Sequence, residues 1–172
     1  MKTSEEGRIF IKQFECFRAQ AYPDPGSDDG KPWTIGHGHT GPDVYRGMKV
    51  TKSEAGTLLI KDLKPVEESI EKLVRLPVLQ NEFDALASFI MNIGISAFKD
   101  STMLKLLNLG KRQESAEEML RWTKNSGRVM GGLLRRRVAE KFMFIGMTPK
   151  DALKKGDEAY AVHKQRVQNT RC

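Results

Sequence analysis

Hydrophobic positions follow the 3.6-residue spacing of a helix near the start of the chain. In this stretch, Ser4 and two glutamates precede the apolar residues Ile9, Phe10 and Phe14. A serine followed by acidic residues is typical of a helix N-terminus, because these side chains interact with the unpaired backbone N–H groups. We therefore predict a first helix that carries Glu15 near its C-terminal end.

Prolines and glycines replace this periodicity between Tyr22 and Gly47. The four prolines in this segment exclude a long helix. Within it, Trp33-Thr34-Ile35 has the aromatic and β-branched composition of a short strand, and the Asp and Gly residues of 26–30 are typical of a turn. The pattern predicts a small β-hairpin lobe over residues 18–50.

Helical periodicity then returns and continues to the end of the chain. Thr51 and Glu54 have the spacing of a capping box, and Pro65 lies in a pattern that fits one long helix or two joined helices. The segment from Phe83 to Ile93 is apolar on more than one face, which predicts a core helix that ends at Gly94. Further helices are expected near Ser101, Gln113, Leu133 and Thr148.

Length and composition agree with one folded domain. At 172 residues, with 39% hydrophobic and 30% charged residues, the chain is typical of a globular protein and unlike a disordered or membrane-spanning one. We expect a single α+β domain over 1–172, mostly helical. It would comprise the hairpin lobe at 18–50, a helical lobe at 51–146 and a peripheral C-terminal helix at 147–172.

Charge and cysteine usage bear on the cellular setting. The formal charge of +7 makes nucleic acid, anionic lipid and an acidic polymer such as the bacterial cell wall candidate partners, and charge alone does not choose among them. Residues 1–6 lack the apolar stretch of a signal peptide, so we expect cytoplasmic synthesis and no stable membrane insertion. Cys16 and Cys172 are too few for a disulfide framework and are expected as free thiols.

Two carboxylates flank the junction of the predicted helix and hairpin. Eight residues separate Glu15 from Asp24, and Thr34 follows in the predicted strand. Cleavage of a glycoside needs an acid that protonates the leaving oxygen and a second carboxylate close by. Burial of Glu15 beside Phe14 and Phe17 would raise its pKa and keep it protonated for that role. Taken singly, a helical glutamate is more often a solvated surface acid, and an aspartate between prolines more often caps a turn.

Longer motifs surround these residues. They are Phe14-Glu15, Ala21-Tyr22-Pro23-Asp24-Pro25-Gly26 and Trp33-Thr34-Ile35-Gly36-His37-Gly38-His39-Thr40-Gly41, with later segments at 80–86, 92–94, 121–122 and 133–140. Together they resemble glycoside hydrolase family 24, the phage-type lysozymes, over residues 4 to about 146. The resemblance implies a lysozyme-like fold with a cleft between the two lobes. It also implies a muramidase that needs no cofactor and hydrolyses the β-1,4 bond between N-acetylmuramic acid and N-acetylglucosamine in peptidoglycan.

The same resemblance assigns catalytic roles. Glu15 would be the general acid, Asp24 would orient the attacking water or stabilise positive charge on the sugar, and Thr34 would help to hold that water. A threonine hydroxyl can both donate and accept a hydrogen bond, which suits it to this position. The separation of the two carboxylates decides between inversion and retention, and the sequence does not give it. Asp28 and Asp29 lengthen the loop after Asp24 and compete with it for the second role.

Several residues are expected to support the site. Thr40 and Asn92 are candidate sugar contacts. Arg18, one helical turn beyond the glutamate, is expected to pair with a carboxylate or to lie on the surface. His39 is expected to hydrogen-bond a carboxylate, or a backbone carbonyl, near the end of the first helix. His37 and His39 alone are too few ligands for a metal ion, so no metal site is predicted.

Two other functions fit parts of the sequence. Hydrolysis of another β-1,4 aminosugar polymer such as chitin would use the same carboxylates, and a catalytically silent basic protein would bind glycan or nucleic acid through its charge. Arg135, Arg136 and Arg137 invite the second interpretation, but successive helical residues point in different directions, so we expect one buried ion-paired arginine and two solvated ones. We predict no nucleic-acid partner. The expected partner is peptidoglycan, reached by a monomer after release through a membrane-permeabilising partner such as a holin.

Overall fold

The computed structural model describes residues 1–23 and 31–169. The chain forms two compact units, one of Met1–Phe10 with Val66–Cys172 and one of Ile11–Pro65. We call the first the helical unit and the second the sheet unit. Four residues that the sequence pattern pointed to lie outside the described ranges: Asp24, Asp28, Asp29 and Cys172.

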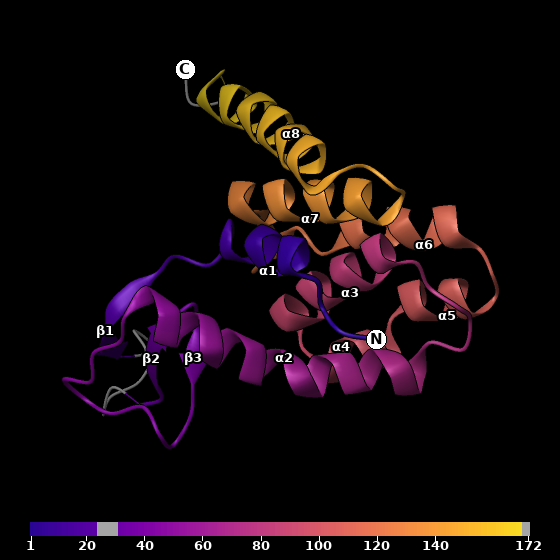
Figure 1. Ribbon diagram of the computed structural model, residues 1–172. Coiled ribbons are helices and arrows are strands. Elements are labelled where there is room, and N and C mark those ends of the chain that lie inside the picture. The colour runs from indigo at the N-terminus through magenta and orange to yellow at the C-terminus, as the bar shows by residue number, and fades with distance from the viewer. Residues whose placement is uncertain (24–30, 170–172) are drawn as a thin grey trace. The chain divides into compact units, whose positions relative to one another are not determined.

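The sheet unit contains a three-stranded antiparallel sheet in the order β1-β2-β3 (Figure 1). The strands are β1 at Arg18–Pro23, β2 at Trp33–Gly36 and β3 at His39–Thr40, which confirms the predicted strand at Trp33. Ile35 of β2 is completely buried in a small hydrophobic core. Burial of one such side chain contributes about 1.5–3 kcal/mol, so this core holds the strands together. Its other buried members are Ala21, Val44, Val50 and Ala55.

The first helix, α1 (Glu5–Lys12), starts where the sequence predicts and ends earlier. The Gly7 backbone N–H donates to the Ser4 hydroxyl at 2.9 Å, which is the expected N-terminal cap. The helix stops at Lys12, so the prediction that Glu15 lies on it is wrong. The residues after Lys12 belong to the sheet unit, and Phe17 packs against the core of that unit.

The second helix, α2 (Lys52–Leu73), is one continuous helix that includes Pro65. The predicted capping box is present, because the Thr51 backbone N–H donates to the Glu54 carboxylate at 2.7 Å and the Glu54 N–H donates back to the Thr51 hydroxyl at 3.2 Å. The boundary between the two units falls within α1 and α2.

The helical unit is built on α3 (Gln80–Ile93). Residues 82–90 are all buried, and Gly94 ends the helix with a φ of 89°, as the sequence predicts. The further elements confirm the expected helices and add α4 and the β4-β5 hairpin, which were not predicted. Their bounds are α4 Ile95–Asp100, α5 Thr102–Asn108, α6 Arg112–Glu118 with a 3-10 turn at Met119–Arg121, β4 Lys124–Asn125, β5 Arg128–Val129, α7 Gly131–Phe144 and α8 Pro149–Asn169.

Two arginines of α7 are buried, where one was expected. Arg136 and Arg137 are 4% and 0% exposed, and their Nε atoms lie 3.0 and 2.7 Å from the Glu140 carboxylate. The Ser88 hydroxyl of α3 donates to the same carboxylate at 2.6 Å, and the Arg137 guanidinium lies 4.7 Å from the centre of the Phe89 ring. Burial lowers the pKa of Arg137, and Glu140 opposes that shift. These arginines connect α7 to α3 inside the helical unit and form no surface stripe.

The C-terminal helix α8 packs on α7 (Figure 1). It begins at the predicted cap, where the Asp151 N–H donates to the Thr148 hydroxyl at 3.2 Å. Gly156 lets the two helices approach closely, since a Cβ at this position would lie 2.5 Å from the Arg135 carbonyl oxygen. Across the described ranges, none of the helices has both the length and the apolar character that a membrane span requires.

Candidate active site

Glu15 lies in the bend that connects α1 to β1. The Phe14 N–H donates to the Ile11 carbonyl at 3.0 Å, so a tight turn closes the helix just before the glutamate. Glu15 is partly buried, and its neighbour Cys16 is an exposed free thiol. The backbone therefore positions Glu15 through a helix-to-strand turn, in place of the helix face that we expected.

The connection between β2 and β3 lies against Glu15. A Cβ at Gly38 would be 3.5 Å from Glu15 Oε2, and Gly38 has a φ of 88°, which side chains rarely adopt. His37 Nδ1 lies 3.4 Å from the Glu15 carbonyl oxygen and, since a carbonyl only accepts, Nδ1 is the donor. The His37 ring also packs against the Phe17 ring, with 5.6 Å between the ring centres. His37 thus supports the glutamate backbone, a role that the sequence pattern gave to His39 alone.

Thr34 lies in the central strand, paired with Tyr22 of β1 and Thr40 of β3. Directly paired residues of antiparallel strands point to the same face of a sheet. Thr34, Thr40 and Tyr22 therefore share one face, which brings together two of the predicted site residues. Pro23 ends β1, and Asp24 is the next residue along the chain.

His39 is on the opposite face, because it pairs with the buried Ile35 next to Thr34. The imidazole is 4% exposed and contacts a carboxylate at each nitrogen, with Nδ1 2.8 Å from Asp62 of α2 and Nε2 3.3 Å from Asp43. The expected hydrogen bond to a carboxylate is confirmed, but its partners are not at the end of the first helix. His39 instead fastens the sheet to α2. Among the described residues, no group of three or more His, Cys, Asp or Glu is arranged to hold a metal ion.

The two carboxylates beside His39 have opposite pKa shifts. The hydrogen bond from Lys61 Nζ, at 3.0 Å, is the largest cause that holds the pKa of Asp43 below its ordinary value, and the Asp43 backbone N–H and His39 act in the same direction. Burial raises the pKa of Asp62, although His39 opposes this shift. The exposed Asp43 is thus a stabilised anion, whereas ionisation of Asp62 is opposed by its surroundings.

Arg18 is not on a helix as expected, and Asn92 belongs to a different unit from the other candidate site residues. Arg18 is the first residue of β1, so it is not one helical turn beyond Glu15. It is exposed, and its guanidinium carbon lies 5.9 Å from the centre of the Tyr22 ring. Asn92 is an exposed residue near the end of α3 and belongs to the helical unit, whereas Glu15, Thr34 and Thr40 belong to the sheet unit.

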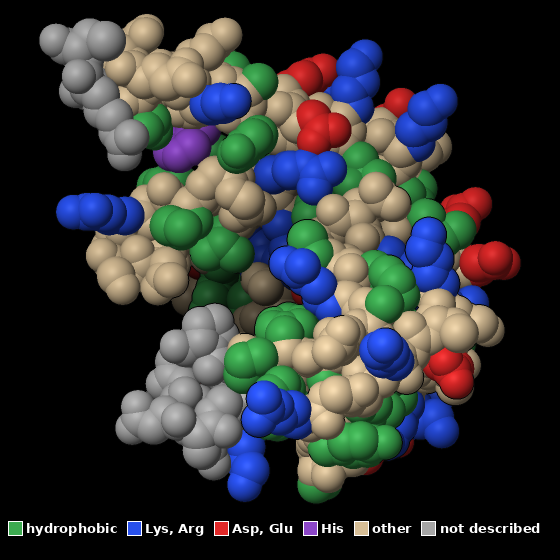
Figure 2. All heavy atoms as spheres, turned by 90° about the vertical axis from the view of Figure 1, so that its left-hand side faces the viewer, with side chains coloured by type: hydrophobic (Ala, Val, Ile, Leu, Met, Phe, Trp, Pro, Cys, Tyr) green, Lys and Arg blue, Asp and Glu red, His purple; other side chains and the backbone are tan. Residues whose placement is uncertain are grey.

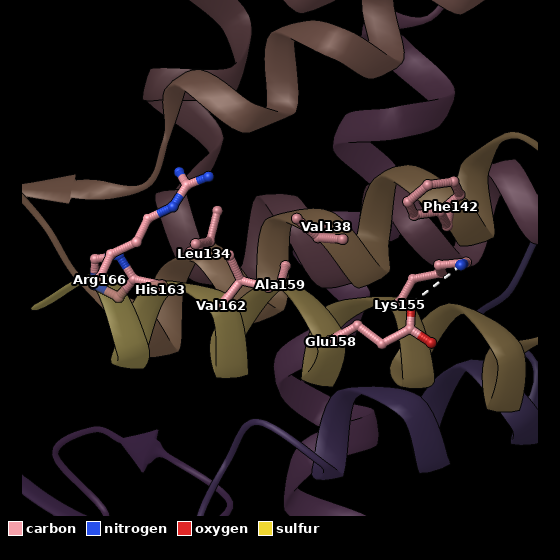
Figure 3. Close-up of a pocket in the computed structure, with 9 residues that line it drawn as sticks. All are labelled: Leu134, Val138, Phe142, Lys155, Glu158, Ala159, Val162, His163 and Arg166. Carbon is pink, nitrogen blue, oxygen red and sulfur yellow. Dashed lines mark hydrogen bonds and ion pairs between the residues drawn. The ribbon is translucent and has the colours of Figure 1, made fainter. Parts of the chain in front are cut away.

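Two surface pockets can be considered as places for glycoside cleavage. One, of about 620 Å³, runs along β1 and is lined by residues 17–22. The other, of about 430 Å³, lies between α7 and α8 (Figure 3), and Glu158 is the acid among its described lining residues. The Glu158 carboxylate pairs with Lys155 at 3.1 Å. One ion-paired acid does not provide the two carboxyl groups of glycoside cleavage, so the α7/α8 groove is a poor candidate.

Surface charge favours an anionic partner. Lys and Arg side chains are spread over much of the face drawn in Figure 2, and Asp and Glu side chains lie mainly in its upper and right-hand parts. With a formal charge of +7, the chain attracts polyanions at low ionic strength, and salt weakens that attraction.

Comparisons with known proteins place these residues in a family context. Residues 12–140 match the family model described as phage lysozyme. The chain is 39% identical to an endolysin of Bacillus phage B103 over 145 residues, which cover 84% of this chain and 54% of that protein. It is 43% identical to an endolysin of Salmonella phage P22 over 149 residues, which cover 84% of this chain and 99% of that protein. The chain therefore spans about half the length of the B103 relative and nearly all of the P22 relative.

A solved structure shares the fold. The muramidase domain of SpmX from Asticaccaulis excentricus superposes with a TM-score of 0.78 at 41% identity, covering 85% of this chain and 99% of that one. This likeness confirms the predicted, mostly helical α+β fold. The family match includes every candidate site residue and ends at Glu140, so α8 lies beyond it.

The contact between Gly38 and Glu15 is testable by a matched pair of substitutions. Gly38→Ala and Gly47→Ala both place a side chain at a positive φ, of 88° and 85°, but only Gly38 is near the glutamate, and Gly47 has nothing within 4 Å. We expect each to lower the free energy of unfolding by about 1 kcal/mol. Only Gly38→Ala should also slow peptidoglycan clearing, by roughly tenfold or more, because the turn that its strained φ would shift is the one beside the Glu15 carboxylate. Equal clearing rates of the two variants would show that this contact is irrelevant to function.

The pKa shifts at His39 predict how stability depends on pH. Because the pKa of Asp43 lies below 3.8 in the folded protein, its ionised form stabilises the fold above pH 3.8, and that contribution is lost as the pH falls through the lowered pKa. The difference in Tm between wild type and Asp43→Asn should therefore shrink on going from neutral pH to below pH 3.8.

Asp62→Asn serves as the contrasting variant. The raised pKa of Asp62 makes its ionisation unfavourable to the fold, so wild type should lose stability relative to Asp62→Asn as the pH rises through that pKa. Parallel pH trends for the two variants would contradict this description of the His39 cluster.

Proposed function

This chain belongs to the phage lysozyme family, and we propose on that basis that it is an endolysin-type muramidase. It would hydrolyse the β-1,4 bond between N-acetylmuramic acid and N-acetylglucosamine in peptidoglycan. The observation that carries the proposal is the position of the Glu15 carboxylate beside the turn at Gly38, within the unit whose central strand carries Thr34. A carboxyl that lies beside a defined turn, on a backbone that His37 contacts, is well suited to proton transfer in a fixed direction.

In the proposed mechanism Glu15 is the general acid that protonates the leaving glycosidic oxygen. Asp24 orients the attacking water or stabilises the positive charge that develops on the sugar, as an oxocarbenium-like transition state requires. Thr34 holds that water, since its hydroxyl both donates and accepts hydrogen bonds. Support for the assignment comes from the order of the three residues within the matched family region and from the position of Thr34 in the central strand.

Other residues bind substrate or support the site in this proposal. Thr40 shares the sheet face of Thr34 and is therefore a sugar contact. Asn92 is a second sugar contact, from the helical unit. Arg18 supports the site from its position in β1. His39 supports the site indirectly, because its bonds to Asp62 and Asp43 hold β3, the strand that carries Thr40.

We further infer that the chain acts as a monomer and reaches the wall after a membrane-permeabilising partner, a holin, has opened the membrane. Endolysins among its relatives motivate this inference. Light scattering measures the molar mass in solution and so tests the monomeric state. The time of lysis with and without the holin tests the route of release. A stable dimer, or lysis on schedule without the partner, would contradict the respective point.

A series of carboxylate substitutions tests the catalytic assignment. Glu15→Gln removes the acid and is expected to lower the rate of peptidoglycan hydrolysis by a factor of about 10²–10⁴. Asp24→Asn should also cause a large loss, whereas Asp28→Asn and Asp29→Asn, which make the same chemical change a few residues along the chain, should retain nearly full activity. The rate of clearing of purified cell walls is the readout, and circular dichroism checks that each variant is folded.

Two results would overturn parts of this scheme. A folded Glu15→Gln variant that clears walls at the wild-type rate would remove the general acid from the mechanism. A loss in Asp28→Asn or Asp29→Asn that exceeds the loss in Asp24→Asn would transfer the second carboxylate role to that residue.

A further inference from the structure

The sheet unit carries a pocket of about 730 Å³ that the proposed chemistry does not use. Its walls come from the start of β2 and from the segment that follows β3, and they combine apolar, aromatic and cationic side chains. The described lining residues with side chains are Lys31, Pro32, Trp33, Pro42, Val44, Tyr45 and Arg46.

The walls of this pocket are formed before any ligand arrives. Val44 is 6% exposed and belongs to the core of the sheet unit, and Trp33 packs against that core. Backbone hydrogen bonds from Val44 N–H to the Gly41 carbonyl and from Met48 N–H to the Tyr45 carbonyl, both 3.1 Å, fix the segment after β3. A site with fixed walls loses little conformational entropy on binding. Tyr45 is nevertheless 64% exposed, which leaves a large aromatic ring in water.

The described lining of the pocket carries cationic side chains. Lys31 and Arg46 are the charged residues of the described lining. Asp43 lies in the same segment, but its carboxylate contacts Lys61 Nζ at 3.0 Å and His39 Nε2 at 3.3 Å. That acid is therefore engaged on the side of α2 and does not neutralise Arg46. The combination of a guanidinium with apolar and aromatic walls fits an anion that carries alkyl groups next to its charge.

Strand register separates this pocket from the candidate active face. Trp33 precedes Thr34 in β2, and successive side chains of a strand point to opposite faces. Thr34 and Thr40 share one face, so the Trp33 wall belongs to the other face of the sheet. Gly41, which follows Thr40 directly, is also a lining residue, so the pocket borders the strand that carries a proposed sugar contact.

We infer that this pocket binds a carboxylate of the peptide attached to the glycan strand. The inference rests on the proposed function, because it concerns the same polymer that the Glu15 site would cleave. Muramic acid carries a peptide with free carboxylates and alkyl side chains, which match Arg46 and the apolar walls. Chitin has neither group, so the pocket gives preference for peptide-bearing glycan. A glycerol-phosphate polymer offers anions but is polar throughout, and it fits the apolar walls less well.

Binding measurements on a hydrolysis-blocked protein test this inference. In the Glu15→Gln background, calorimetry would compare two soluble probes: disaccharide-peptide fragments of peptidoglycan, and the same glycan from which an amidase has removed the peptide. Arg46→Gln should weaken binding of the peptide-bearing probe about tenfold, as expected for loss of a charge-assisted hydrogen bond, and leave the peptide-free probe unchanged. Arg128→Gln, which removes the same charge from an exposed position in β5, should change neither.

Two outcomes would overturn the assignment. Unchanged binding of the peptide-bearing probe to Arg46→Gln, or equal weakening of both probes, would each show that the pocket does not recognise the peptide carboxylate. Activity separates this failure from failure of the proposed function. If the protein with Glu15 intact hydrolyses peptidoglycan while Arg46→Gln binds normally, the muramidase stands and the pocket assignment is wrong.

Discussion

The position of the Glu15 carboxylate beside the turn at Gly38 is the constraint on which the proposed chemistry depends. A Cβ at Gly38 would lie at an ordinary van der Waals distance of 3.5 Å from Glu15 Oε2, so it is the φ of 88° that calls for glycine in this turn. The same turn contributes His37, whose Nδ1 faces the Glu15 carbonyl. Other contacts hold the turn in place: Gly36 allows close packing on Ala55, and His39 joins the sheet to Asp62. Glu15 therefore has its backbone next to His37 and its carboxylate beside the turn, which suits a reaction that needs directed proton transfer.

Polar and charged side chains inside the protein connect its elements, and the charged ones on its surface remain available to partners. His39 lies between two carboxylates in the sheet unit, and Arg136 and Arg137 meet Glu140 in the helical unit. Buried ion pairs contribute little net stability, but removal of one partner leaves an uncompensated charge that costs about 3–5 kcal/mol. These clusters therefore specify which elements pack together. Exposed cations such as Arg46 remain available to attract an anionic partner.

Sequence patterns predicted the elements well and their ends less well. Capping residues at Ser4, Thr51 and Thr148 mark helix starts through local hydrogen bonds, so they could be found without the fold. The end of α1 could not, because Phe14 and Phe17 continue the apolar spacing of the helix although Phe17 packs against the core of the sheet unit. Spacing shows that a residue is buried but not in which core.

For the same reason the sequence did not predict three features of the structure. They are the second buried arginine of α7, the contact of His37 with Glu15, and the pocket beside Trp33, and all of them depend on residues distant in sequence. Glu15, Asp24 and Thr34 were recognisable only through their motif context, since each alone has a structural explanation.

Mass analysis of the fragments released from purified peptidoglycan tests the assignment most directly, because the new chain end identifies the bond that was cut. A muramidase that uses Glu15 as its acid generates new reducing ends at N-acetylmuramic acid, and a folded Glu15→Gln variant generates almost none. New reducing ends at N-acetylglucosamine, release of peptides without new reducing ends, or undiminished cleavage by Glu15→Gln would contradict the function that we derive for this chain.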